Sequence, residues 1–356
     1  MDTSAPSPSP SPSPEALRRA AARPKVVLHD HLDGGVRPAT VVSSAAAAGV
    51  ALPTPDPGAL ARWFTITPGM PLDEAWQRFA LVIDVLQDAG ALRRVAREAV
   101  EDLALDGVVH AELRFAPLSH TAGGLTADEV VAAVVEGLDD ATSATGTTAG
   151  IIVCGLREQG PETVAAAFDL AAAWVGRGVV GVDLAGPEVG FPADDHVAAF
   201  ARAREAGLGV TIHAGEMDGV DSIRRALACR PDRLGHGWRI IDDCRVVDGA
   251  IVDLGPVATE VHDAGIPLEV CVTSNACLGL PVDQHPAPLL AAAGFRLTVN
   301  PDDRAITTTT TSREHALWAE VLGFDDAWLD AAQRTALDVA FDPVDRAGVA
   351  ARLTPR

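Results

Sequence analysis

Hydrophobic residues in this chain follow two alternating patterns, which together predict repeated strand–helix units. One pattern is a short, nearly continuous run of aliphatic residues that ends in polar residues, as expected for a parallel strand buried on both faces. The other is a longer stretch, rich in Ala, Leu and charged residues, with helical periodicity. Eight segments show the first pattern: Val26–Asp33, Gly107–Pro117, Gly150–Arg157, Val179–Gly186, Gly209–Glu216, Arg233–Trp238, Pro267–Asn275 and Arg296–Asp303.

The helical stretches between these strands carry recognisable start and stop signals. Thr126 is followed three positions later by Glu129, the spacing of a capping box. Gly207 and Gly294 stand where a glycine typically ends a helix. Three of the predicted helices are Thr126–Leu138, Glu162–Val175 and Asp194–Glu205.

Eight strand–helix units are the number that closes a TIM (β/α)8 barrel, which is the α/β fold that we expect. The alternative is an open doubly wound sheet, which needs a Gly-rich phosphate-binding turn after its first strand. No G-x-G-x-x-G motif follows any of the predicted strands, and this favours the barrel.

The connection after the first predicted strand, residues 34–106, is far longer than an ordinary βα loop. It contains a Pro-rich loop at Pro53–Pro57 and at least two helices, Asp73–Gln87 and Ala91–Ala104. Because βα loops lie over the C-terminal mouth of a barrel, we expect this insertion to form a helical lid over the site.

The N-terminal segment differs from the rest of the chain. Residues Met1–Pro14 alternate Ser and Pro, a composition that favours extended, solvated chain. We therefore expect residues 1–22 to be a disordered tail and residues 23–356 to form a single barrel domain.

Charge and cysteine content restrict the class of partner and the compartment. The formal net charge is -21, which argues against nucleic acid or an anionic membrane surface as a partner and favours a small neutral substrate. The five cysteines form no C-x-x-C motif, and no run of 18 apolar residues predicts a transmembrane helix. We expect reduced thiols in a cytoplasmic protein.

Polar residues gather at the C-terminal ends of five predicted strands, and in a barrel these ends meet on one face. His29 and His31 share one face of their strand, because side chains alternate with period two. With His213 and a carboxylate from the last strand they form a set of N and O donors that suits catalytic zinc. The residues at these ends are His29, His31, Asp33, Gly186, His213, Glu216, His236, Asp302 and Asp303.

Two of these residues have chemistry beyond metal binding. Glu216 is either a proton donor held in a closed pocket or a helix-start acid favoured by the helix dipole. His236 lies between two glycines, which leave space around its imidazole, and this favours a functional role. Lys25 is the only lysine in the chain, so no lysine can bridge two metals from the fourth strand and a single metal is expected.

Other polar and thiol groups are expected to be structural. Glu112 and Arg114 alternate on the second strand and are predicted to form an ion pair inside the barrel. The cysteines are placed away from the converging strand ends. Six histidines are treated as ordinary surface or structural residues: His110, His120, His196, His262, His285 and His315.

Six segments, taken together in order and spacing, resemble the adenosine deaminase family over residues 24–345. They are Pro24–Gly34, Ala111–Pro117, Val182–Gly186, Thr211–Glu216, Arg233–Gly237 and Val299–Asp303. The resemblance implies a zinc TIM barrel that hydrolyses the exocyclic amine of adenosine or a relative. It implies one zinc ion held by His29, His31, His213 and Asp302. It also implies that Glu216 protonates the purine N1 and that His236 orients and deprotonates the attacking water.

The same resemblance implies contacts to the substrate. Asp303 would hydrogen-bond N7, the backbone N–H of Gly186 would meet N3, and Asp33 would contact the ribose. Trp76 and Phe79, in the insertion, fall where the family keeps apolar residues against the substrate.

Three residues near the mouth depart from the family pattern: Pro187, Pro301 and Arg304. They leave the proton carriers and ligands intact and leave the substrate open. We expect deamination of adenosine or 2′-deoxyadenosine. The alternatives are another aminopurine compound, such as aminodeoxyfutalosine, adenine or a modified adenosine, and a deaminase-like protein that binds purine without turnover.

Overall fold

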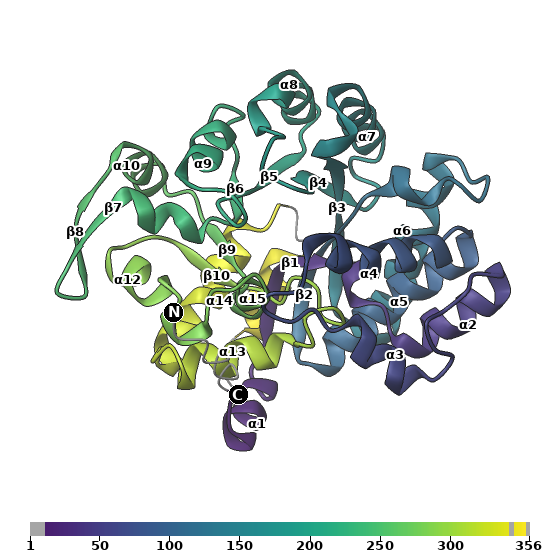
Figure 1. Ribbon diagram of the computed structural model, residues 1–356, viewed down its shortest axis with the longest axis horizontal. Helices are drawn as coiled ribbons and strands as arrows, with labels where there is room; N and C mark the ends of the chain where they lie inside the picture. Colours follow the sequence, from purple (N-terminus) through teal and green to yellow (C-terminus); the bar gives the residue numbers. More distant parts are fainter. Residues whose placement is uncertain (1–10, 342–344, 354–356) are drawn as a thin grey trace.

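The computed structural model describes residues 11–341 and 345–353 and places eight parallel strands in one sheet (Figure 1). Neighbouring strands follow one another in chain order apart from a hairpin that lies outside the sheet. The last strand returns to the first through a bridge between Asp30 and Asp302, so the sheet forms a nearly closed barrel. The strands are β1 (Lys25–His31), β2 (Val108–Phe115), β3 (Thr148–Leu156), β4 (Val179–Ala185), β5 (Gly209–Ala214), β6 (Arg233–His236), β9 (Leu268–Val270) and β10 (Leu297–Val299).

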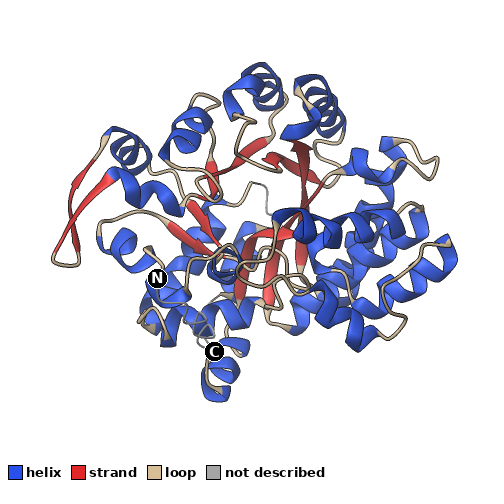
Figure 2. Cartoon of the chain, viewed as in Figure 1, coloured by secondary structure: helices blue, strands red, loops and turns tan. Residues whose placement is uncertain are grey.

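Helices surround this sheet (Figure 2), which confirms the predicted TIM (β/α)8 fold. The strands are buried throughout most of their length because helices cover the outside of the barrel and side chains fill its interior. The helices are α1 (Pro14–Ala21), α2 (Pro38–Ala48), α3 (Pro57–Phe64), α4 (Leu72–Val85), α5 (Ala89–Leu105), α6 (Ala127–Thr145), α7 (Pro161–Ala173), α8 (Val197–Glu205), α9 (Val220–Leu227), α10 (Pro256–Asp263), α11 (Val272–Cys277), α12 (Ala287–Ala292), α13 (Thr311–Glu320), α14 (Asp326–Val339) and α15 (Arg346–Arg352).

Capping residues in the sequence predicted several helix ends correctly. Thr126 and Glu129 form the predicted capping box at the start of α6. Gly207 and Gly294 both have positive φ just beyond α8 and α12, as expected of glycines that end helices. None of the described helices combines the length and the apolar character needed to cross a bilayer.

The long insertion between β1 and β2 is helical, as predicted, and contains α2, α3, α4 and α5. Helix α5 packs along α6, and α4 supplies side chains to a cavity at the mouth of the barrel. That this insertion works as a lid stays a prediction.

The seventh and eighth predicted strands are too long. The chain leaves the sheet after Val270, and Val272–Cys277 form the short buried helix α11 instead of the end of a strand. The last strand stops at Val299, since Pro301 has no N–H for a strand ladder and Asp302 has a φ of 66°. Both irregular segments deliver polar side chains to the mouth of the barrel.

The expectation of a disordered tail through residue 22 is wrong for Pro14–Ala21, which form helix α1; residues 1–10 lie outside the described residues. Ser13 caps this helix, and Ala16 and Ala20 pack against Ala316 of α13. Ion pairs from Arg19 and Arg23 to acidic residues of α14 hold it in place.

A hairpin formed by β7 (Cys244–Val247) and β8 (Ala250–Leu254) was missed. Its turn residues, Asp248 and Gly249, both have positive φ, as a type I′ turn requires. The Asp-Gly pair between two apolar runs was the signal that could have predicted it.

Candidate active site

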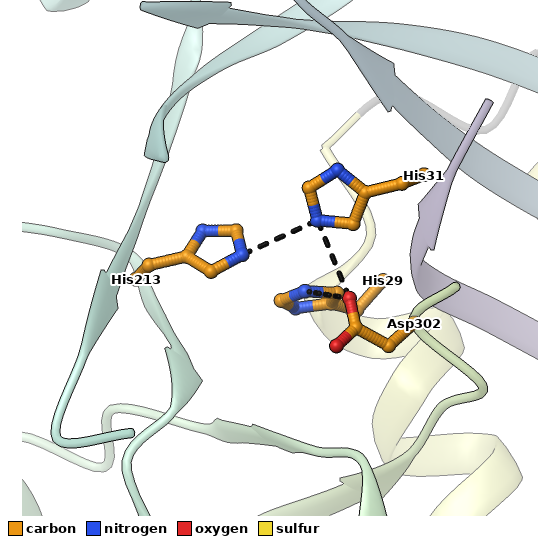
Figure 3. A group of neighbouring side chains, drawn as sticks. All are labelled: His29, His31, His213 and Asp302. Carbon is orange, nitrogen blue, oxygen red and sulfur yellow. Dashed lines mark hydrogen bonds and ion pairs between the residues drawn. The ribbon is translucent and has the colours of Figure 1, made fainter. Parts of the chain in front are cut away.

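Four side chains from three separate strand ends meet at the mouth of the barrel (Figure 3). His29 and His31 lie on β1, His213 on β5, and Asp302 follows β10. His29 Nε2 lies 3.1 Å and His31 Nε2 3.3 Å from Asp302 Oδ1, and the Nε2 atoms of His31 and His213 are 3.3 Å apart. One potential ligand atom from each residue lies within 4.8 Å of all the others.

These donors fit a zinc ion in both chemistry and direction. Three imidazole nitrogens and one carboxylate oxygen form a set that catalytic zinc sites use. The buried His29 Nε2 and Asp302 Oδ1 atoms have no hydrogen-bond partner among the described residues, although unpartnered buried polar atoms are costly. A cation between the four side chains would satisfy them.

A buried layer of charged residues orients two of the four donors. Glu269 on β9 accepts from His29 Nδ1 at 2.8 Å, and Asp183 on β4 pairs with His213 Nδ1 at 2.9 Å. Both histidines therefore turn Nε2 toward the cluster, the arrangement that partners behind a metal ligand commonly produce. Burial opposes ionisation of Asp183 and Glu269. His213, and then Arg114, nevertheless hold the pKa of Asp183 below its usual range, and Arg114 does the same for Glu269.

The predicted ion pair between Glu112 and Arg114 is wrong. Arg114 reaches Asp183 and Glu269, at 2.8 Å each, and Glu112 pairs with Arg233 on β6. Glu112 and Arg114 are two apart on one strand, so both side chains point to the same side of the sheet. Each pairs with residues of other strands instead of with the other.

The backbone around Asp302 joins β1 and β10, two of the three strands that supply the four side chains. The N–H of Asp302 donates to the carbonyl of His29, and the N–H of His31 donates to the carbonyl of Asp302. Positive φ is uncommon outside glycine and is maintained by surrounding structure. Here the two hydrogen bonds that close the barrel maintain it, so Pro301 is compatible with the position of Asp302.

Glu216 lies beside the cluster, on the turn that follows β5. Burial, then the negative charges of Asp302 and Glu188, hold the pKa of Glu216 well above its usual range. Such a shift favours the protonated carboxyl, which can donate its proton.

The turn that carries Glu216 is held by another buried carboxylate, Glu188. Its oxygens accept from the backbone N–H groups of Gly215, Glu216 and Met217, at 2.8 Å each, and from the hydroxyl of Ser222. One side chain therefore sets the position of the turn.

His236 lies at the end of β6, with its ring against those of His29 and His213. Its Nδ1 is 3.2 Å from the amide of Asn275 and 3.3 Å from Glu216 Oε1. Its Nε2 is buried without a hydrogen-bond partner among the described residues and lies 3.8 Å from Asp302 Oδ2. This nitrogen is free to interact with a group bound at the cluster.

Asp303 and Asp33 lie on the other side of the cluster. Burial, then the charge of Asp302, holds the pKa of Asp303 well above its usual range, and burial raises that of Asp33 to about 6. Gly34 is required here, because a Cβ at this position would lie 1.8 Å from Asp303 Oδ1.

A cavity of about 440 Å³ opens above the cluster, a size that suits a small ligand. Its floor is polar and its walls are largely apolar, with Trp76 and Phe79 of α4 among the lining residues. Gly186 and Glu158 line it on the side of β3 and β4. No Lys or Arg is found among the described residues that line it.

The structure therefore brings together all the predicted site residues. The placement of the cysteines is wrong, because Cys154 and Cys277 line the cavity. Sequence reasoning also assigned no role to Asp183, Glu188 and Glu269. Asp183 and Glu269 were detectable as charges within apolar strands, where a buried charge needs a partner.

A family model described as Adenosine deaminase matches residues 24–352. The adenosine deaminase of Mycobacteroides abscessus is 43% identical over 334 residues, which are 90% of this chain and 91% of the relative.

Two solved structures are similar. An amidohydrolase from Burkholderia ambifaria, with bound Zn, has a TM-score of 0.85 at 27% identity and covers 96% of this chain and 93% of its own. The N6-methyl-AMP deaminase of Arabidopsis thaliana has a TM-score of 0.79 at 26% identity, with coverages of 95% and 98%.

Proposed function

Because the chain belongs to the adenosine deaminase family of aminohydrolases, we propose that it converts adenosine or 2′-deoxyadenosine to inosine or 2′-deoxyinosine and ammonia. The observation that carries this proposal is the ring of proton-handling groups around the four metal-binding donors. Glu216, His236 and Asp303 all lie at the floor of one cavity beside them.

His29, His31, His213 and Asp302 would hold one zinc ion, which when bound lowers the pKa of water and supplies a nucleophile at neutral pH. His236 would accept a proton from the attacking water, because its Nε2 faces the cluster and has no hydrogen-bond partner among the described residues. Glu269 and Asp183 keep His29 and His213 in the orientation that binding requires.

Glu216 and Asp303 bind the two edges of the purine. The proton on Glu216 is donated to N1, which withdraws electron density from C6 and makes that carbon easier to attack. Asp303, which burial also keeps protonated, donates a hydrogen bond to N7. The water oxygen forms a bond to C6, and the bond from C6 to the exocyclic nitrogen breaks. The amine leaves as ammonia with the proton that His236 accepted, and the hydroxyl proton at C6 returns to Glu216 as the carbonyl of the product forms.

The lining of the cavity favours an uncharged nucleoside over a nucleotide. Asp33 and Glu158 are acidic, and no Lys or Arg lines the cavity among the described residues. A phosphate would lack a charged partner there and would be repelled. The apolar walls, which include Trp76 and Phe79, suit the faces of a purine ring.

A panel of aminopurines, assayed with metal analysis of the same sample, tests the proposal. Zinc-loaded protein should release ammonia from adenosine and 2′-deoxyadenosine with a loss of the adenosine absorbance band, and AMP should be a poor substrate. Preference for adenine, aminodeoxyfutalosine or a modified adenosine would replace the substrate that we propose. Binding of purine without ammonia from any compound would contradict catalysis.

A further inference from the structure

The order of strands around the barrel, taken with the proposed contacts of Glu216 and Asp303, indicates where the sugar of a bound nucleoside would lie. If C6 is over the four donors, N1 faces Glu216 after β5, and N3 lies further along the same edge, toward β4. The opposite edge, with N7 and C8, runs from Asp303 after β10 toward Asp33 after β1. The strand order β1-β2-β3-β4-β5 then leaves N9 pointing at the ends of β2 and β3.

The β2–β3 sector of the cavity has one charged side chain. Phe115 and Ala116 from the end of β2 and Cys154 and Leu156 from β3 offer mainly apolar surface. Glu158, which follows directly in the 3-10 turn Arg157–Gln159, also lines the cavity.

Glu158 is placed to reach the edge of the ligand. A Cβ on Gly186 would lie 2.3 Å from Glu158 Oε2, so the carboxylate occupies the space that a side chain on β4 would otherwise fill. Its neighbour Arg157 donates to the backbone carbonyls of Phe191, Leu184 and His213 and is absent from the described cavity lining. Glu158 is exposed, so its carboxylate is accessible at this edge of the cavity.

We propose that Glu158 is a specificity-determining residue that accepts a hydrogen bond from a sugar hydroxyl of the nucleoside. This assignment rests on the proposed deamination of adenosine. The chemical class that it selects is an unphosphorylated nucleoside with a free hydroxyl at this edge of the cavity.

The test compares wild type, Glu158→Ala and Glu158→Gln on adenosine and on its 2′-, 3′- and 5′-deoxy analogues. A hydrogen bond to a charged group corresponds to a loss of roughly 10- to 100-fold when removed. We expect Glu158→Ala to reduce kcat/KM for adenosine by that factor, mostly through KM, because the contact is remote from the reacting carbon. Glu158→Gln should lose less, since its amide oxygen still accepts.

The decisive result is non-additivity. At least one deoxy analogue should be a poorer substrate of the wild type and should lose no further activity in Glu158→Ala. Glu162→Ala, an exposed change in the next helix, is the matched control and should leave every ratio unchanged. Zinc content and thermal unfolding of each variant show that the fold is intact.

Two failures can be told apart. If wild type deaminates adenosine but Glu158→Ala reduces all four substrates by one common factor, or reduces none, the assignment of Glu158 is overturned while the proposed function stands. If zinc-loaded wild type deaminates no nucleoside, both fall together.

Discussion

At the residue scale, the chemistry of Glu216 comes from negative surroundings. Burial and the charges of Asp302 and Glu188 all favour its protonated form. His236, by contrast, is kept neutral chiefly by burial, which holds its pKa well below the usual value. The two groups are thus set up in opposite roles, one holding a proton and the other able to take one.

Glu216→Gln should retain zinc and the fold but lose roughly 10²- to 10⁴-fold in kcat on adenosine, the usual contribution of a positioned acid. The amide occupies the same space but has no acidic proton to give to N1. Steady-state kinetics with zinc analysis checks this result, and turnover at the wild-type rate would refute the role of Glu216.

The metal-binding and proton-carrying residues predicted from the sequence share one property: they stand at strand ends, where polar side chains interrupt apolar runs. Asp183 and Glu269 stand inside strands, and their roles depend on which strands are neighbours across the barrel. Alternation along one strand carries no information on such partners, which is why Arg114 was paired wrongly with Glu112.

At the element scale, the turn after β5 depends on the turn after β4. Glu188, from the β4 side, is the common acceptor of three backbone N–H groups and one hydroxyl on the β5 side. The position of Glu216 is therefore built by two neighbouring loops, and apolar periodicity does not encode this contact.

Glu188→Gln should lower kcat by about 10- to 100-fold, as expected for loss of hydrogen bonds to a charged acceptor. Removing the Glu188 charge also lowers the pKa of Glu216. As the pH is raised, activity should therefore fall at a lower pH than in the wild type. Ser222→Ala removes one donor without removing that charge, and so serves as a milder comparison. A pH–rate profile whose alkaline limb does not move would show that Glu188 has no electrostatic effect on Glu216.

Strands and helices could be predicted where apolar residues recur with the period of that element. Their boundaries could not be predicted where the chain leaves the strand to form the candidate site. The run from Pro267 to Asn275 reads as one strand, yet its second half is helix α11. That helix presents Ser274 to the cavity and Asn275 to His236. When a strand and a short helix are buried on all sides, both have a continuous apolar sequence, and periodicity cannot distinguish them.

At the scale of the whole molecule, the barrel follows from the count and order of strand–helix units, and closure follows from the Asp30–Asp302 bridge. Helix α1 was missed although Glu15–Ala21 are strong helix formers, because the expected disordered tail was extended past the Ser/Pro residues. Its stability comes from α13 and α14, which are about 300 residues later in the chain, as in the Ser13–Glu320 pair at a separation of 307.

Glu314, a buried carboxyl at the start of α13, should make global stability depend on pH. Burial raises its pKa from 4.5 to about 7. The folded state therefore holds this proton more tightly than the unfolded chain, and stability is lost as pH rises from about 4.5 to about 7. At 1.36 kcal/mol per unit, this interval corresponds to roughly 3 kcal/mol.

Glu314→Gln should raise the thermal unfolding temperature at pH 8 and change it little at pH 4.5, with the metal content held constant. Its amide oxygen can accept from the backbone N–H of Thr273, and its amide N–H can donate to the hydroxyl of Thr309. Glu205→Gln, at an exposed position of α8, provides the control. An equal shift at both pH values would contradict an ionisation effect.

We propose that the four side chains at the mouth of the barrel hold one zinc ion, and that adenosine deamination depends on this ion. The most direct test measures zinc content and ammonia release from adenosine on the same preparations of wild type and Asp302→Ala, with the exposed Asp283→Ala as control. We predict one zinc per chain and ammonia release in wild type and control, loss of both after chelation, recovery of both when zinc is restored, and low values of both in Asp302→Ala. Full ammonia release from metal-free protein, or unchanged zinc content in Asp302→Ala, would contradict the claim.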